Sequence, residues 1–233
     1  SGLPKQPFDA MKFFRWRNYR EFGTGASGDM FVHLLTAIHM ITSSKGPARI
    51  FCSGQLSMWK DGRDVPDVMN ALMEYPETAE HGAFQVNLRL NFASGAGEGF
   101  RVRFIGDEGA MELGDDLTIT HNIIPKAPGI GNYDALSTYP QAMQDALVKA
   151  YDQKYSAADK TTPKKEPIRY KAPDGHDEHV QHFTNFFNAV RTGGKVVEDA
   201  VFGFRAAAPC LACNESYFQK KLMHWDPVGM KLV

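Results

Sequence analysis

The chain has 233 residues, of which 43% are hydrophobic and 12% aromatic, enough for one sizeable core. Its 26 basic and 27 acidic residues leave a net charge of −1, so no overall field would attract nucleic acid or an anionic membrane. No apolar run reaches membrane-spanning length, and three cysteines, an odd number, argue against a disulfide framework. The compartment stays open between cytoplasm and periplasm.

The N-terminal part predicts a helix behind a glycine-rich turn. Residues 8–22 are aromatic and basic together, and glycines follow them in residues 23–28. An apolar helix is then expected from Asp29 to Ile41, because small, polar and proline residues at 43–47 end the pattern.

Short strands are predicted next. Their expected ranges are 48–59, 68–75, 83–93, 100–113 and 117–121, with a polar turn at 60–67 and a hairpin turn at 106–109. Residues 83–93 alternate between apolar and polar side chains, which gives one apolar and one polar face. Because no helix separates these segments, we predict an α+β fold: an open, mostly antiparallel sheet with helices packed on one face.

The second half predicts helices joined by polar segments. An irregular stretch, a helix and a solvated Lys/Pro-rich loop are expected at 122–138, 140–155 and 156–176. Two more helices follow at 177–191 and 196–221; the first ends at Gly193 and Gly194, and the second is kinked or split near Pro209. Trp225 begins the tail, and residues 1–233 are predicted to form a single domain.

Asp29 and His33 are the candidate chemical groups. Their i, i+4 spacing places them on one stripe of the predicted helix, with Thr36 close by. A carboxylate beside an imidazole fixes its tautomer and supports its charged form, as a general acid or base requires. The alternative is structural: Asp29 is a first-turn or capping acid, and His33 is a hydrogen-bonded core histidine. The residue pattern leaves both open.

The stretch W-R-N-Y-R-E-F-G-T-G-A-S-G-D-M-F-V-H, residues 16–33, resembles the second domain of the Gfo/Idh/MocA family of NAD(P)-dependent sugar and cyclitol oxidoreductases. The D-x-G-x-H motif of that family is matched at Asp29 and His33, although Phe31 replaces the glycine and Thr36 replaces a common acid. Residues 104–113 resemble the family's hairpin, and 182–195 with 203–208 resemble its C-terminal helices. The likeness covers most of residues 8–225.

The resemblance implies roles for these residues. His33 would exchange the proton of the substrate hydroxyl, and Asp29 would orient it. The sugar would be bordered by Arg15, Trp16, Arg17, Tyr19, Thr24 and Thr36. Aromatic and arginine side chains also suit plain packing of a chain that enters a core, so the two interpretations stand side by side.

The resemblance also implies a missing half. The sequence has no strand–GxGxxG–helix and no E-K-P segment with the active-site lysine, and SGAGEG at 94–99 lies between two predicted strands. We therefore expect a domain that lacks its N-terminal Rossmann partner, which would bind NAD or NADP. This fragment is expected to bind no cofactor and to be inactive alone. The polar sheet face would make a homo-oligomer.

Three rival hypotheses remain. A structural zinc site would use Cys210 and Cys213 with histidines at 176, 179 and 182, but the signature lacks a paired second half, so no metal is expected. A non-catalytic carbohydrate-binding or scaffolding module would use the polar sheet face, which carries Gln85, Asn87, Arg89 and Asn91. The third hypothesis keeps the family resemblance but changes the reaction: the protein would be part of an NAD-assisted glycoside hydrolase.

Overall fold

The computed structural model describes residues 3–114, 116–131 and 133–233. The chain forms two compact units, one up to Glu98 and again over Glu178–Val233, the other over Gly99–Asp177. Each unit contains one sheet in which every strand pairing is antiparallel. The predicted α+β class is confirmed, with two sheets where one was expected. That residues 1–233 form a single domain stays a prediction.

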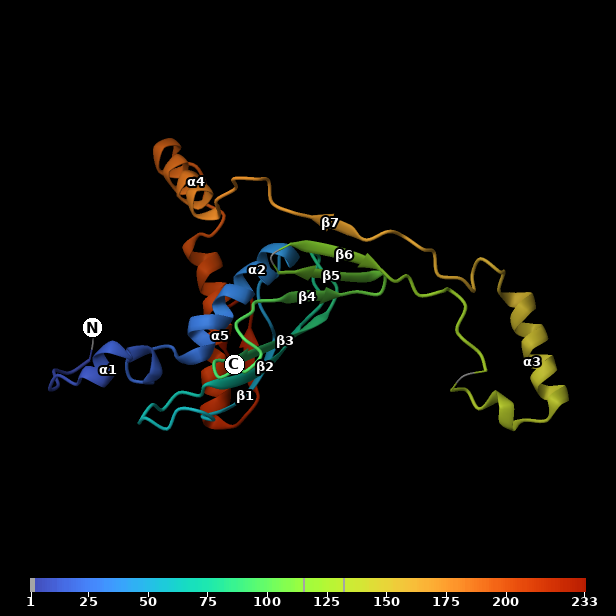
Figure 1. The fold of residues 1–233 in the computed structure, drawn as a ribbon, viewed down its shortest axis with the longest axis horizontal. Helices are drawn as coiled ribbons and strands as arrows, with labels where there is room; N and C mark the ends of the chain where they lie inside the picture. The colour runs from blue at the N-terminus through green and yellow to red at the C-terminus, as the bar shows by residue number, and fades with distance from the viewer. Residues whose placement is uncertain (1–2, 115, 132) are drawn as a thin grey trace. The chain divides into compact units, whose positions relative to one another are not determined.

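The sheet of the first unit is built largely from the predicted strands (Figure 1). Its order is β3-β2-β1-β8-β9. The strands are β1 (Arg49–Gln55), β2 (Val68–Tyr75), β3 (Phe84–Asn91), β8 (Met223–Asp226) and β9 (Lys231–Leu232). On β2 every second side chain is buried, and on β3 the alternate side chains are buried or half-buried, because alternate residues of a strand point to opposite faces. The polar residues of β3 are exposed, as the alternation predicted.

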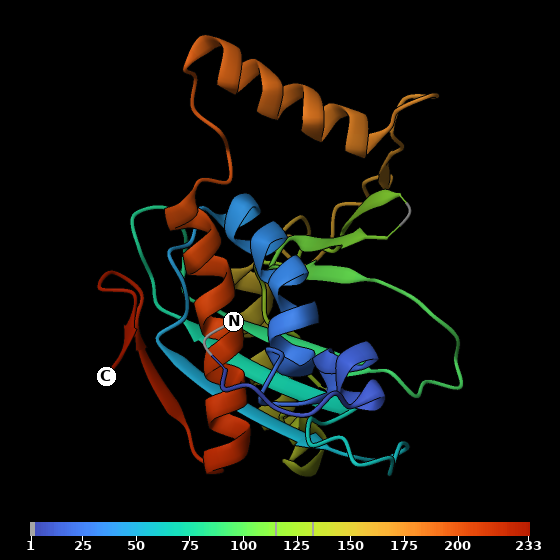
Figure 2. The ribbon, with the colours of Figure 1, turned by 90° about the vertical axis from the view of Figure 1, so that its left-hand side faces the viewer.

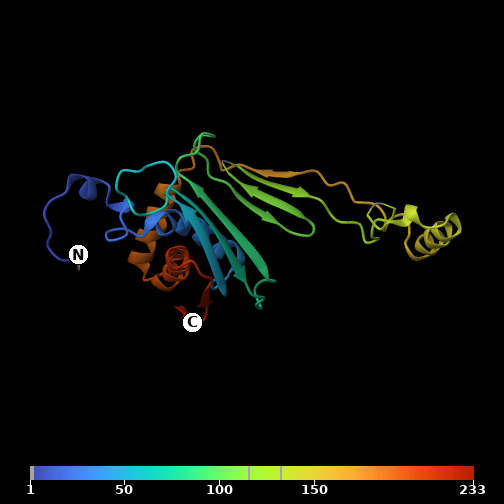
Figure 3. The same cartoon turned by 90° about the horizontal axis from the view of Figure 1, so that it is seen from below.

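Two helices cover the buried face of this sheet. Figure 2 shows α2 (Val32–Thr42) and α5 (Ala200–Gln219) side by side, and Figure 3 shows α5 on one side of the strands. Small residues such as Ala206 and Ala212 are buried on α5, which lets its backbone approach β1 closely. Pro209 lies inside α5, yet the helix continues through it, so the predicted split does not occur.

The contact between α5 and β1 also completes a hydrogen-bond ladder. Strand β8 pairs with β1 only at Arg49 and Ile50. Further along β1, the N–H of Cys52 donates instead to the Ser216 hydroxyl at 2.8 Å, and that hydroxyl donates to the carbonyl of Lys221 at 2.7 Å. A serine on the helix thus satisfies a buried backbone group that the short strand leaves open.

A histidine is buried in the same core. His39 on α2 is 1% exposed, and its Nε2 lies 2.9 Å from the hydroxyl of Tyr75 on β2. Tyr75 stacks on Phe84 with ring centroids 4.4 Å apart. The other ring nitrogen of His39, Nδ1, is buried and has no hydrogen-bond partner among the described residues. Burial first, and then the charges of Arg205 and His81, together lower the pKa of His39 to about 4.

The remaining helices of the first unit lie at the surface. Helix α1 (Ala10–Phe14) and a 3-10 turn (Trp16–Asn18) form the N-terminal segment, and α4 (Glu178–Thr192) has no buried residue. Helix α4 is followed by Gly193 at φ 67°, the predicted left-handed stop. No helix in the described ranges has both the length and the apolar character that crossing a bilayer requires.

The second unit carries a sheet of order β4-β5-β6-β7. The elements are β4 (Val102–Ile105), β5 (Gly109–Leu113), β6 (Leu117–His121), a 3-10 turn (Leu136–Thr138), α3 (Gln141–Lys154) and β7 (Ile168–Tyr170). Strands β4 and β5 form the predicted hairpin, closed by Gly106 N–H donating to the Gly109 carbonyl at 2.9 Å. The loop predicted over 156–176 is largely exposed, but it includes β7, which pairs with β6.

Candidate functional site

The glycine-rich turn is held against α5 by one asparagine. Asn214 accepts from the buried Ser27 hydroxyl at 2.7 Å, and its amide nitrogen donates to the Thr24 carbonyl. Gly25 has φ 65°, and a Cβ there would lie 3.1 Å from the Asn214 side chain. The glycines therefore let the backbone turn tightly against α5, as their spacing suggested.

The helix after this turn begins with a wide segment. Ser27–Phe31 form a π-helical turn that leads directly into α2. Such a turn is wound less tightly than an α-helix; Asp29 lies within it, and His33 lies in the first turn of α2. Asp29 pairs with Arg17, whose Nε donates to Oδ1 at 3.3 Å. Within the described residues, no hydrogen bond joins Asp29 to His33.

His33 lies in the first turn of α2 with an exposed side chain. It makes no hydrogen bond or ion pair with any residue that the structure describes. The alternative in which His33 is a hydrogen-bonded core histidine therefore fails. The buried histidine of this helix is His39.

A polar cleft of about 510 Å³ lies beside Asp29. Its walls are formed by the N-terminal segment, the glycine-rich turn and the loop between β1 and β2. Its lining includes Arg15, Arg17, Asn18, Asp29, Trp59, Asp61, Arg63, Asp67 and Phe92. Three of the residues predicted for the site, Arg15, Arg17 and Asp29, thus come together here.

One wall of the cleft includes residues 60–67, which the sequence predicted only to be a polar turn. Arg63 donates to both carboxylate oxygens of Asp61, from Nε at 2.8 Å and from Nη2 at 2.7 Å. These hydrogen bonds lower the pKa of Asp61 to about 2, and they raise the pKa of Arg63 above its ordinary value. The guanidinium of Arg63 also lies 4.9 Å from the centre of the Trp59 ring.

Asp67 holds this loop in place through hydrogen bonds to the loop backbone. Its carboxylate is 1% exposed and accepts from the backbone N–H groups of Ser57, Met58 and Trp59 at 2.7, 2.8 and 3.2 Å. Burial acts to raise the pKa of Asp67, but the three N–H donors outweigh it, so the pKa lies below its ordinary value. A buried charge therefore fixes the loop that carries Trp59, Asp61 and Arg63.

The other predicted site residues lie apart from the cleft lining. Trp16 borders a second, apolar cavity of about 530 Å³ formed by the N-terminal segment. Tyr19 is buried at 8% exposure, as plain packing would require. Thr24 is exposed, and Thr36 is half-buried on α2.

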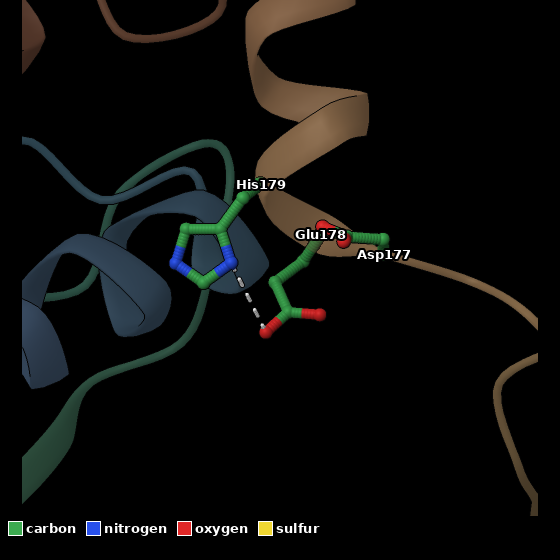
Figure 4. Close-up of side chains that lie close together, drawn as sticks. All are labelled: Asp177, Glu178 and His179. Carbon is green, nitrogen blue, oxygen red and sulfur yellow. Dashed lines mark ion pairs between the residues drawn. The ribbon is translucent and has the colours of Figure 1, made fainter.

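The residues of the rival metal hypothesis differ in burial. Cys210 and Cys213 are free, buried thiols; burial is the main cause that raises the pKa of Cys210, and the hydrogen bond with Cys52 is the main cause for Cys213. Three consecutive residues at the start of α4, Asp177, Glu178 and His179, hold candidate ligand atoms within 4.8 Å of one another (Figure 4). All three are exposed, and exposed acidic groups commonly gather without an ion, so this group carries no site.

Gly28→Ala should destabilise the chain by about 1–3 kcal/mol, because it overpacks the turn that shapes the cleft. A Cβ at this position would lie 2.4 Å from Cβ of Thr24 and 3.0 Å from Cδ2 of Leu211. Urea unfolding measures the loss. Gly95→Ala is the matched control, since nothing lies within 4 Å of its added Cβ. Equal stabilities of the two variants would contradict the expected overpacking.

Comparisons with known proteins give one family match and several solved structures with a similar fold. Residues 4–112 match the family model described as the GFO/IDH/MocA C-terminal domain. No curated protein matches the sequence. Among solved structures, the aldose-aldose oxidoreductase from Caulobacter crescentus, complexed with glycerol, is 15% identical with a TM-score of 0.56, over 96% of this chain and 52% of that one.

Two further solved structures agree. An NAD binding oxidoreductase from Klebsiella pneumoniae is 15% identical with a TM-score of 0.57, over 95% of this chain and 55% of that one. An oxidoreductase from Agrobacterium radiobacter, in complex with NAD+, L-tartaric acid and magnesium, is 12% identical with a TM-score of 0.53, over 96% and 55%. This chain spans about half the length of each. Residues 4–112 thus resemble the C-terminal domain of the GFO/IDH/MocA family, and the three solved structures share the fold of this chain.

Proposed function

We propose that this chain is the substrate-binding half of an NAD(P)-dependent oxidoreductase that acts on a hydroxyl group of a sugar-like molecule. The observation that carries the proposal is the polar cleft, which brings Arg15, Arg17 and Asp29 together in a segment matched by the family model. The similar proteins from Caulobacter crescentus and Klebsiella pneumoniae, named as aldose-aldose and NAD binding oxidoreductases, support this class of reaction.

The cleft has the chemistry that a hydroxylated ring requires. Its volume of about 510 Å³ suits a small molecule, and Trp59 and Phe92 supply aromatic surface against which a ring can pack. Carboxylate oxygens accept hydrogen bonds from hydroxyl groups, and guanidinium groups donate to them. Arg17 and Asp29, held together at 3.3 Å, offer a donor and an acceptor side by side.

His33 is the group that we propose for the proton exchange. Imidazole is the side chain best suited to accept and return a proton near neutral pH. The His33 ring is exposed at the start of α2 and does not itself line the cleft, so the proposal requires the reacting hydroxyl to extend beyond the cleft lining. Because Asp29 pairs with Arg17, we assign Asp29 to substrate positioning in this state, while its orientation of His33 would require a change of partner.

The one glycine cluster considered for a dinucleotide does not have the context of a dinucleotide-binding fingerprint. Residues 94–99, the glycine cluster, join β3 to β4 and are not followed by a helix, so they lack the backbone N–H groups that hold a pyrophosphate. We therefore propose that NAD or NADP is held by a separate dinucleotide-binding domain, where it would accept the hydride. This chain alone would bind substrate without turning it over.

The outer face of the first sheet is the proposed contact between copies of the chain. It presents exposed amide and charged side chains of β3 and, on the far side of β2, the exposed Phe51 of β1. Polar side chains with an aromatic residue are typical of subunit contacts that remain partly hydrated. The same face is where a non-catalytic carbohydrate-binding module would bind its ligand.

His33→Ala is expected to lower kcat by about 100- to 10,000-fold in the enzyme assembled with its dinucleotide-binding domain, because general acid–base catalysis contributes that much. The dissociation constant of the substrate should change little, since the cleft is intact. Steady-state kinetics and calorimetric titration measure the two quantities, and product analysis separates net oxidation from NAD-assisted glycoside cleavage.

His224→Ala is the control, because that side chain is also exposed and lies on β8. It should leave kcat unchanged, and both variants should unfold at the same urea concentration as the original protein. Unchanged turnover in His33→Ala would sink the proposed role of His33 and favour the binding-module hypothesis.

A further inference from the structure

The charged groups that line the polar cleft balance in formal charge but not in hydrogen-bonding capacity. They are three guanidinium groups, Arg15, Arg17 and Arg63, and three carboxylates, Asp29, Asp61 and Asp67. A guanidinium has five N–H donors and no acceptor. Arg63 uses two of its donors on Asp61, and Arg17 uses one on Asp29. Within the described residues, the side chain of Arg15 donates to no protein group.

The acceptors of the cleft are more fully used than its donors. Both oxygens of Asp67 accept from backbone N–H groups of the loop, and both oxygens of Asp61 accept from Arg63. Among the three carboxylates, Asp29 alone keeps an oxygen without a hydrogen bond from the described residues, because Arg17 uses Oδ1 alone. The cleft therefore offers many unused donors to a ligand and few unused acceptors.

A ligand that matches this surplus must be rich in acceptors. A neutral polyol brings a donor with every hydroxyl, so it would leave guanidinium donors unmatched. A carboxylate or a phosphate brings acceptors only, and a guanidinium binds either one through two parallel hydrogen bonds. Such a group at Arg15 would leave the sugar ring to lie against Trp59 and Phe92.

We propose, resting on the proposed function, that the substrate is an anionic sugar, carrying a carboxylate or a phosphate, and that Arg15 is the residue that binds this group. Arg15 suits the role because it alone among the three guanidinium groups has no carboxylate partner in the described part of the chain. Arg17 and Arg63, in contrast, already form ion pairs with Asp29 and Asp61 in the cleft wall.

The test is a set of calorimetric titrations of this chain at low salt. The probes are D-glucose, D-glucuronate and D-glucose 6-phosphate, which separate the neutral, carboxylate and phosphate cases. At least one charged probe should bind about 10- to 100-fold more tightly than glucose, as expected for charge-assisted hydrogen bonds. Raising the salt concentration should weaken the binding of that charged probe and leave the binding of glucose unchanged.

Arg15→Gln should remove the advantage of the charged probe over glucose. Arg49→Gln is the matched control, because Arg49 is a half-exposed arginine on β1 that pairs with Glu74 and does not line the cleft. Loss of the advantage in Arg15→Gln alone supports the inference.

Two outcomes overturn the inference. In the first, glucose binds as tightly as both charged probes and Arg15→Gln changes nothing, which leaves the proposed oxidoreductase function standing with a neutral sugar. In the second, none of the probes binds at millimolar concentration. The His33→Ala assay then decides the proposed function independently, because it measures turnover rather than the recognition of an anion.

Discussion

Lowering the pH from 7 to 4 should reduce the free energy of unfolding, and His39 should contribute about 3 kcal/mol of that loss. The side chain is 1% exposed, and burial lowers its pKa from 6.5 to about 4. Arg205 and His81 oppose its charged form as well. The neutral ring contacts the hydroxyl of Tyr75, whereas a protonated ring would place an uncompensated charge in the core.

The sign follows from which state binds the proton. Below pH 6.5 the unfolded chain takes up a proton at His39, but the folded chain resists until about pH 4. The contribution of His39 to the free energy of unfolding is therefore fully present above pH 6.5. It is lost as the pH falls from 6.5 to 4. The lowered pKa of Asp67 acts at more acidic pH, below the ordinary carboxyl value, so the two effects separate.

Urea unfolding at pH 7 and at pH 4.5 measures this contribution. In His39→Gln the difference between the two pH values should shrink by about 2–3 kcal/mol, because glutamine does not titrate. His224→Gln, an exposed histidine, should keep the original difference. The readout is the pH dependence, so a uniform loss of stability in His39→Gln does not obscure it. The same pH dependence in all three proteins would contradict the predicted role of His39.

Local sequence signals predicted the elements that depend on local structure. The alternation of apolar and polar residues located β3 to within two residues at its C-terminal end, and β2 and β6 were predicted with the bounds that the structure has. The glycine that terminates α4 also followed from a local rule, since left-handed φ favours glycine. These signals lie within a few residues of the feature that they specify.

Elements that depend on distant partners were missed. Strands β8 and β7 are short, and each exists because another strand pairs with it: β1 in one case, β6 in the other. The division of the strands between two sheets likewise depends on pairing rather than on composition. Pro209 predicted a kink or a split in α5; the helix is not split, because its packing on β1 outweighs the lost hydrogen bond.

The candidate site was predicted only in part, for the same reason. Arg15, Arg17 and Asp29 follow one another closely in the chain, and the resemblance pointed to all three. Asp29, in the π-helical turn at Ser27–Phe31, pairs with Arg17, which the residue pattern did not suggest. The loop with Asp61 and Arg63 was treated as a polar turn; its D-G-R-D sequence, flanked by a tryptophan, was the available signal.

Asp67→Ala should destabilise the protein by about 3 kcal/mol, because it strips three backbone N–H groups of their acceptor. The carboxylate is 1% exposed, so water cannot replace it without opening the loop. Asp67→Asn should cost less, about 1–2 kcal/mol, since the amide keeps one acceptor oxygen but brings a donor toward other donors.

The loss at Asp67 should extend to ligand binding, because its carboxylate holds the loop that carries Trp59, Asp61 and Arg63 into the cleft wall. Urea unfolding measures the stability of both variants, with Asp107→Ala in the exposed turn after β4 as the control. Titration with the tightest of the sugar probes should show weaker binding to Asp67→Asn even where that variant is fully folded. Original stability in Asp67→Ala would mean that the three N–H groups find other acceptors, and the buried carboxylate would then not be what shapes the cleft.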